Sequence, residues 1–180
     1  MVANSIKKNY TLKGSCSMEK HLHDDDFIVS KTDLKGRITY GNDMFIDMSG
    51  YSESELLGAP HNILRHSDMP KIIFKLLWDR VQSKEEIFAF VKNRCKNDDY
   101  YWVFTNVTAS LDKNGNIVGY YSVRRKPNPE AIQTIVPIYK KLLDVEHSSG
   151  MEASLKELES ILNNNNNKVT YDEFITTIQK

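Results

Sequence analysis

The chain has 180 residues, its 24 Lys and Arg residues balance 24 Asp and Glu residues, and 40% of it is hydrophobic. This length suits one domain, or one domain with an appendage, and the balanced charge argues against a nucleic-acid partner. No apolar run approaches the roughly 20 residues that span a bilayer, and residues 1–20 lack a signal-peptide core. Two cysteines are too few for a disulfide framework. We therefore expect a cytoplasmic protein without direct membrane insertion.

Residues 1–26 are polar and end in His21-Leu22-His23-Asp24-Asp25-Asp26. Histidine and aspartate are good metal ligands, so this run could hold a metal ion. The interpretation that we prefer is a solvated N-terminal arm over residues 1–26.

Residues 27–32 and 37–40 predict two strands, because Asp33-Leu34-Lys35-Gly36 between them has the residue types of a turn. Asn42 or Asp43 can then cap a short apolar helix that Gly50 closes.

Ser52 and Glu55 have the spacing of a capping box, which predicts a second short helix. Residues 70–81 predict the longest helix of the first hundred residues, with Pro70 in its first turn. The apolar stripe of this helix comprises Ile73, Phe74, Leu77, Trp78 and Val81.

After Lys84 the hydrophobic period changes from helical to two, and residues 87–96, 100–111 and 117–125 predict three long strands. Their connections are too short for parallel crossovers, so the strands should form an antiparallel meander. The whole order predicts an α+β fold, with a five-stranded antiparallel sheet and short helices on one face. We assign residues 27–126 to this domain.

Residues 127–147 should form a flanking helix that kinks or restarts at Pro137, followed by the linker Ser148-Ser149-Gly150. Residues 148–180 predict a helical, Asn-rich appendage that resembles a degenerate EF-hand. Asn164, Asn166, Val169 and Glu173 fit positions 3, 5, 8 and 12 of such a loop, whereas Leu162 and Asn167 depart from positions 1 and 6. We prefer a calcium-free helix–loop–helix or an asparagine spacer.

Several short motifs along the chain resemble one family when they are taken together. They are Lys31-Thr32-Asp33-Leu34, Gly41-Asn42-Asp43-Met44-Phe45, Ser49-Gly50-Tyr51, His61-Asn62, Arg65-His66, Asp68-Met69-Pro70, Leu77-Trp78, Val91-Lys92-Asn93-Arg94 and Tyr100-Tyr101-Trp102-Val103. Residues 28–143 thereby resemble the PAS domain of Aer-type receptors in bacterial aerotaxis and energy taxis.

The resemblance implies non-covalent binding of FAD and a redox sensor that signals to a chemotaxis-type transducer or another signalling protein. No anchor, HAMP segment or methyl-accepting hairpin follows, so we expect a stand-alone PAS partner similar to the CetB proteins. PAS domains commonly pair, so a homodimer is a further expectation.

A flavin site needs aromatic walls and a few fixed polar groups. Phe74, Trp78 and Phe88 can supply the walls, although the first two could simply be core. Asn93 can bond the pyrimidine edge of the flavin, and Arg124 is a second candidate for that edge. By their motif positions, Asn42, Arg65, His66 and Asp68 could hold the ribityl-diphosphate side. Arg65 could instead form a surface ion pair with Asp68, and His66 could be a structural or pH-sensitive histidine.

Two departures from the family pattern bear on FAD binding. The run Phe88-Ala89-Phe90 stands where the family often has Trp-Ser-Gly, and Asn93-Arg94-Cys95 replaces Asn-Arg-Arg. Residues 58–66 contain no cysteine, so the adduct chemistry of light-oxygen-voltage domains is not expected.

Two other functions remain open from the residues. His61 or His66 could ligate haem in a gas sensor, or the domain could be a cofactor-free interaction module. An enzyme is not expected, because the chain has no nucleophile–base pair at motif spacing, no phosphate-binding glycine loop and no metal-binding Cys/His set.

Overall fold

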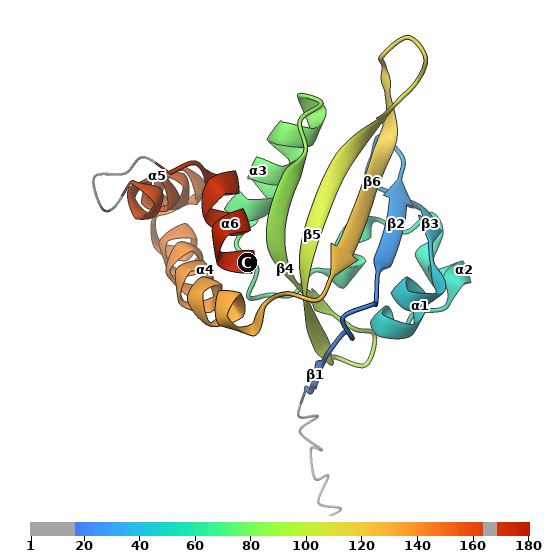
Figure 1. Cartoon of the computed structure of the whole chain (residues 1–180), viewed down its shortest axis with the longest axis horizontal. Coiled ribbons are helices and arrows are strands. Elements are labelled where there is room, and N and C mark those ends of the chain that lie inside the picture. Colours follow the sequence, from blue (N-terminus) through green and yellow to red (C-terminus); the bar gives the residue numbers. More distant parts are fainter. Residues whose placement is uncertain (1–16, 164–168) are drawn as a thin grey trace, which may run out of the picture.

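The computed structural model describes residues 17–163 and 169–180, and a strongly twisted sheet forms its centre (Figure 1). Five strands pair antiparallel in the order β4-β5-β6-β2-β3, so the predicted sheet is confirmed. They are β2 (Ile28–Thr32), β3 (Ile38–Gly41), β4 (Ile87–Arg94), β5 (Tyr100–Leu111) and β6 (Ile117–Arg125).

A further strand, β1 (Glu19–Lys20), pairs in parallel with the start of β5. Leu22 then packs into the core with 3% of its surface exposed. The prediction of a solvated arm is therefore wrong at Leu22, while most of residues 17–26 are exposed as predicted. Residues 1–16 lie outside the described residues. Over the described ranges no group of three or more His, Cys, Asp or Glu side chains could hold a metal ion.

Short helices fill the connection between β3 and β4 on one face of the sheet. They are α1 (Asp43–Ser49), α2 (Glu53–Leu56), the 3₁₀ turn η1 (His61–Leu64) and α3 (Lys71–Gln82). The Asn42 side chain caps α1, and Gly50 ends it in the left-handed conformation, with φ of 73°. The predicted capping box of Ser52 and Glu55 opens α2.

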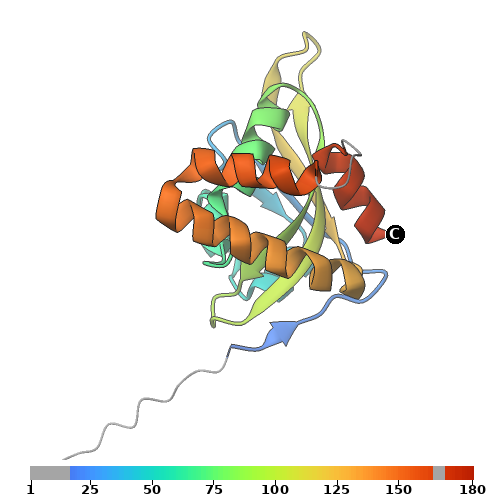
Figure 2. The ribbon, with the colours of Figure 1, turned by 90° about the vertical axis from the view of Figure 1, so that its left-hand side faces the viewer.

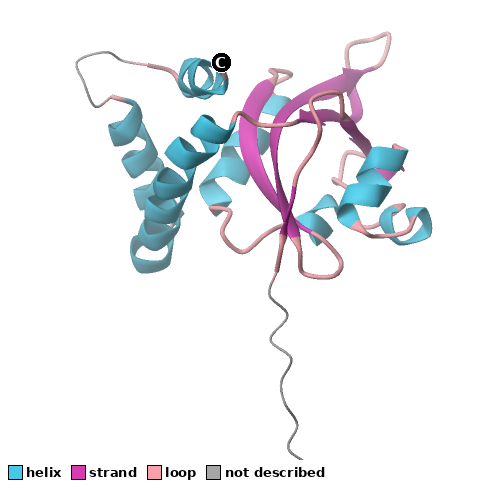
Figure 3. Ribbon diagram, turned by 60° about the horizontal axis from the view of Figure 1, so that its bottom comes forward, coloured by secondary structure: helices cyan, strands magenta, loops and turns pink. Residues whose placement is uncertain are grey.

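Three C-terminal helices, α4 (Pro129–Ser149), α5 (Met151–Leu162) and α6 (Tyr171–Gln179), lie together beside β4 (Figures 1 and 3). The helices α4 and α5 run antiparallel (Figure 2). The hydroxyl of Tyr139 on α4 donates to the carbonyl of Phe90 at 2.9 Å, and its ring lies 6.3 Å from that of Trp102. These contacts place α4 over the face of β4 and β5 that is turned away from α3. No helix in the described part of the chain is long and apolar enough to cross a membrane.

The helix α4 continues through Pro137, so it does not restart there, and the kink that the sequence analysis gave as the alternative stays a prediction. Pro137 lies on the exposed side, while Ile135 and Tyr139 are buried and hold the helix against the sheet on both sides of it. The expected linker is also shorter, because Ser148 and Ser149 complete α4 and the break comes at Gly150, with φ of 84°.

The carboxylate of Glu173 accepts hydrogen bonds from the backbone N–H and hydroxyl of Thr170, both at 2.8 Å, and so caps α6. The asparagines of the EF-hand comparison, Asn164, Asn166 and Asn167, lie outside the described residues.

Candidate functional site

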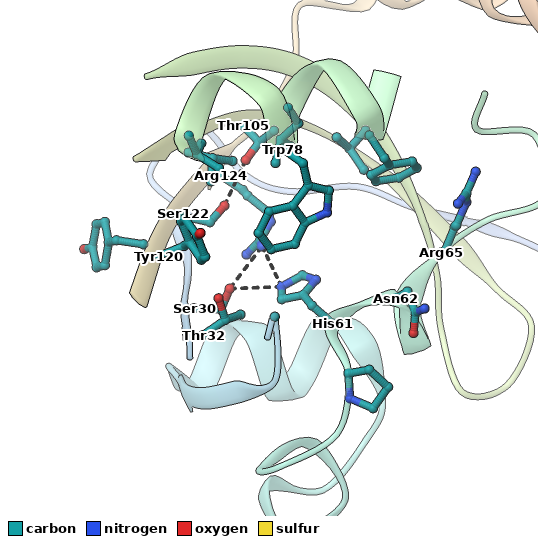
Figure 4. Close-up of a pocket in the computed structure, with 18 of the residues that line it drawn as sticks. Ser30, Thr32, His61, Asn62, Arg65, Trp78, Thr105, Tyr120, Ser122 and Arg124 are labelled. Atoms are coloured by element: carbon teal, nitrogen blue, oxygen red, sulfur yellow. Dashed lines mark hydrogen bonds between the residues drawn. The ribbon is translucent and has the colours of Figure 1, made fainter. Parts of the chain in front are cut away.

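A cavity of about 500 Å³ lies between the inner face of the sheet, α3 and η1 (Figure 4). Ligand pockets in proteins span roughly 300–1,000 Å³, so the cavity can hold a cofactor-sized group. Its residues come from six of the strands and helices just described and from the loops that join them.

The helix α3 forms an apolar wall of this pocket, with Phe74, Leu77, Trp78 and Val81 along one side. The Trp78 ring meets the Tyr120 ring edge-on, with centroids 5.0 Å apart and planes at 87°. Behind Trp78, the turn between β2 and β3 approaches closely at Gly36, where an added Cβ would lie 3.2 Å from the indole. The wall is therefore aromatic and held in place from both sides.

The opposite end of the pocket is polar and centres on Arg124 of β6, which is 5% exposed. Its Nη2 donates to Ser30 Oγ at 3.0 Å and to His61 Nε2 at 2.8 Å (Figure 4). Since a guanidinium only donates, His61 Nε2 is an acceptor and this imidazole is neutral. Burial lowers the pKa of His61 to about 3, and the charge of Arg124 acts in the same direction.

Two buried donor atoms in the pocket have no hydrogen-bond partner among the described residues, Arg124 Nη1 and Asn93 Nδ2. Asn93, on β4, is 4% exposed. The Tyr101 hydroxyl lies near the Asn93 amide. Burial raises the pKa of Tyr101, and the Asn93 amide acts against that rise. No hydrogen bond of normal geometry joins the hydroxyl to the amide, however. The described salt bridges include no acidic partner for Arg124. Because unpaired buried donors are rare, both atoms point to a missing acceptor in the pocket.

Arg65 stands at the mouth of the pocket, where the chain between η1 and α3 touches β4. Its backbone forms an antiparallel bridge with Asn93. Its guanidinium lies over the Phe74 ring, 4.5 Å from the centroid, and Nη2 donates to the Met69 carbonyl at 3.2 Å. The remaining donors of Arg65 are available to an anionic group at the opening.

Of the nine residues that the sequence suggests for cofactor binding, five line the pocket: Arg65, Phe74, Trp78, Asn93 and Arg124. Asn42 does not, because its amide is used in the fold. The oxygen accepts from the N–H groups of Val29 and Phe45 at 2.9 and 3.1 Å, and the nitrogen donates to the Phe27 carbonyl at 2.7 Å.

The other three also lie outside the lining. His66 Nδ1 accepts from the backbone N–H of Asp68, and the Asp68 carboxylate pairs with Lys92 at 2.7 Å. Burial lowers the pKa of His66, with the charge of Lys92 acting in the same direction. Phe88 lies on the other face of β4, where its ring stacks on Phe104.

Sequence reasoning missed the hydroxyl residues of the pocket, among them Ser30, Thr105 and Ser122. Thr105 and Ser122 form a hydrogen bond across β5 and β6 at 3.0 Å. Ser122 and Arg124 are two residues apart on β6, so the strand period places them on one face, and this signal could have found the hydroxyl.

Cys95 lies beyond the end of β4 and outside the pocket lining. Its Sγ is 3.1 Å from the Met48 carbonyl, and burial raises the pKa of the thiol to about 11. A thiol of this kind is a poor nucleophile.

Comparison with known proteins places the fold in a family. Residues 38–124 match the family model described as the PAS fold. The aerotaxis receptor of Escherichia coli strain K12 is 44% identical over 121 residues, which are 67% of this chain and 24% of the receptor. A nitrogen fixation regulatory protein of Klebsiella pneumoniae is 27% identical over 97 residues, which are 54% of this chain and 20% of that protein. The matches thus span a quarter or less of these relatives.

Two solved structures share the fold. A light-oxygen-voltage domain studied with a flavin analogue has a TM-score of 0.54 and 21% identity, covering 64% of this chain and 86% of that domain. The dark structure of the Aureochrome1 light-oxygen-voltage domain has a TM-score of 0.51 and 24% identity, covering 68% and 83% of the two chains. The family match, the receptor match and the common fold show that this chain belongs to the PAS family and carries a domain similar to part of the aerotaxis receptor.

Proposed function

We propose that this protein is a cytoplasmic redox sensor, which binds FAD in the pocket and passes its redox state to a chemotaxis-type transducer or another signalling protein. The observation that carries the proposal is the pair of unpartnered buried donors, Asn93 Nδ2 and Arg124 Nη1, in an otherwise largely apolar pocket. The similarity to the aerotaxis receptor supports the same assignment. The chain acts as a sensor and not as an enzyme.

The pocket residues fit the chemistry of a flavin. An isoalloxazine is flat and apolar over most of its area, and its pyrimidine edge carries carbonyl acceptors. Asn93 and Arg124 would hold that edge, Phe74 and Trp78 would pack on the ring system, and Arg65 would meet the diphosphate at the opening. When bound, the flavin supplies reversible electron transfer.

Haem is the weaker alternative, because neither candidate histidine offers the pocket a ring nitrogen with a free lone pair. His61 Nε2 accepts from a guanidinium at 2.8 Å, and an iron ion there would lie beside a buried positive charge. His66 is outside the lining. A cofactor-free interaction module leaves the two unpartnered donors without an explanation.

The test is to purify the protein, record its absorption spectrum, release the chromophore by heat and determine its mass. We expect the two flavin bands and FAD, and we expect Arg124→Met to lose most of the bound flavin. Arg125→Met is the matched control, since Arg125 is the next residue on β6 but is exposed and stacks over Phe104 on the other face. A Soret band would assign haem. A colourless protein that also takes up no added FAD would refute the proposal.

A further inference from the structure

The carboxylate of Glu146 on α4 joins the C-terminal helices to the start of α3, the helix that forms the apolar wall of the pocket. Its oxygens accept hydrogen bonds from the backbone N–H groups of Lys71 and Ile72, at 2.8 and 2.9 Å. These two residues begin α3, and they are 75 and 74 positions from Glu146 along the chain. A residue outside the five-stranded domain therefore caps the helix that carries Phe74 and Trp78.

The segment around α3 provides no cap of its own. Pro70 stands at the N-cap position, where its side chain makes no capping hydrogen bond, and the first turn has no acidic residue. Helix N-termini leave backbone N–H groups unsatisfied and favour a negative charge. Glu146 supplies both the acceptors and the charge.

A short covalent path joins this cap to the opening of the pocket. Arg65 donates to the carbonyl of Met69, and Pro70 alone separates Met69 from Lys71, whose N–H binds Glu146. Pro70 has a fixed φ, here −60°, so a shift of Met69 is passed on to the start of α3. The other end of α3 is also held by the C-terminal helices, because Arg80 binds Asp172 of α6 at 2.6 Å.

We infer that Glu146 is a positioning residue of the pocket, and that through it the packing of α4–α6 and the occupancy of the pocket are linked. The C-terminal helices are then part of the cofactor site and change with it. The inference rests on the proposed function only because the first experiment uses FAD as the ligand.

The first experiment measures the FAD dissociation constant of the full chain carrying Glu146→Ala. Couplings between sites are usually fivefold or larger, so we expect FAD to bind at least about fivefold more weakly than to the wild type. The dissociation constant of Glu146→Gln, which keeps an acceptor oxygen, should lie between those of the wild type and Glu146→Ala. The control is Glu157→Ala, which removes the ion pair with Lys141 that links α4 to α5. It should stay within about twofold of the wild type, a change of under half a kcal/mol. Unchanged binding in Glu146→Ala, or an equal loss in Glu157→Ala, would overturn the inference.

A second measurement needs no cofactor. Arg65→Ala, Glu146→Ala and the double variant are unfolded in urea, with Glu146→Gln replacing Glu146→Ala if the latter does not fold. Substitutions at two residues that both hold the start of α3 should have non-additive effects on stability. The change in the unfolding equilibrium constant of the double variant should therefore differ about twofold or more from the product of the two single changes. Additive effects would overturn the inference. If the wild type takes up no FAD, the proposed function fails and this cycle alone decides about Glu146.

Discussion

Replacing Arg124 with methionine should leave the cofactor-free protein at least as stable as the wild type. Burial lowers the pKa of Arg124 from 12.5 to about 10, which corresponds to about 3 kcal/mol against keeping the charge inside. Its hydrogen bonds to Ser30 and His61 offset about 1–3 kcal/mol of this. After the substitution, Ser30 can still donate to His61 Nε2, which lies 3.1 Å away. The net change in unfolding free energy should therefore fall between about zero and 2 kcal/mol in favour of the variant, whereas most substitutions destabilise by about 0.5–3 kcal/mol.

The same substitution should weaken FAD binding, because a hydrogen bond from a charged donor is worth about 1.5–3 kcal/mol. That corresponds to about a 10- to 150-fold higher dissociation constant. Urea unfolding of the cofactor-free protein and titration with FAD measure the two effects separately, with Arg125→Met as the control. A variant that is less stable by more than about 2 kcal/mol, and that binds FAD like the wild type, would show that Arg124 serves the fold.

Three further substitutions test the structure by urea unfolding. In the folded protein His61 has a pKa of about 3 and stays neutral above it, whereas in the unfolded chain the imidazole takes up a proton near pH 6.5. The folded state therefore loses stability as the pH is lowered from about 6.5 toward 3. The wild type should lose about 2 kcal/mol from this group between about pH 7.5 and pH 5, and His61→Gln should lose less by that amount; equal slopes would exclude a neutral His61. Gly119→Ala should cost about 2 kcal/mol or more, because its Cβ would lie 2.4 Å from the Thr32 carbonyl oxygen, and a stable variant would contradict that approach. Tyr139→Phe should cost about 1 kcal/mol through the lost hydrogen bond to Phe90, and an unchanged midpoint would argue against this contact.

The sheet could be predicted because its long strands carry their own pattern. Strands β4 to β6 alternate with period two and are separated by Asn- and Asp-rich turns. Strand β1 has no such signal, since Glu19 and Lys20 are polar and become a strand only because the start of β5 offers unpaired backbone groups. The continuity of α4 through Pro137 likewise depends on burial on both sides of the proline, which local propensity does not contain.

On the strands, the candidate site could be predicted where a polar residue stands at an inward position. Asn93 and Arg124 satisfy this rule, and both line the pocket. Phe88 is an odd number of residues from Asn93 on the same strand, so the alternation already separates their faces. Asn42 could not be assigned in this way, because an asparagine that caps a helix and an asparagine that binds a ligand occupy the same kind of position in a sequence. The cap from Glu146 was beyond sequence reasoning, because it joins segments that only the tertiary packing brings together.

The unpartnered donors and the C-terminal helices contribute to the free energy of folding with opposite signs. Arg124 and Asn93 make the empty pocket costly, since buried donors without partners each oppose folding. The helices α4 to α6 oppose that cost on the other side of the sheet, where they bury apolar residues such as Ile135, Leu142 and Ile175, all 1% exposed or less. A ligand that satisfies the donors relieves the cost on the pocket side, and Glu146 connects that side to α4. The arrangement therefore lets a change of hydrogen bonding in the pocket alter how firmly the C-terminal helices are held, without requiring the sheet itself to rearrange.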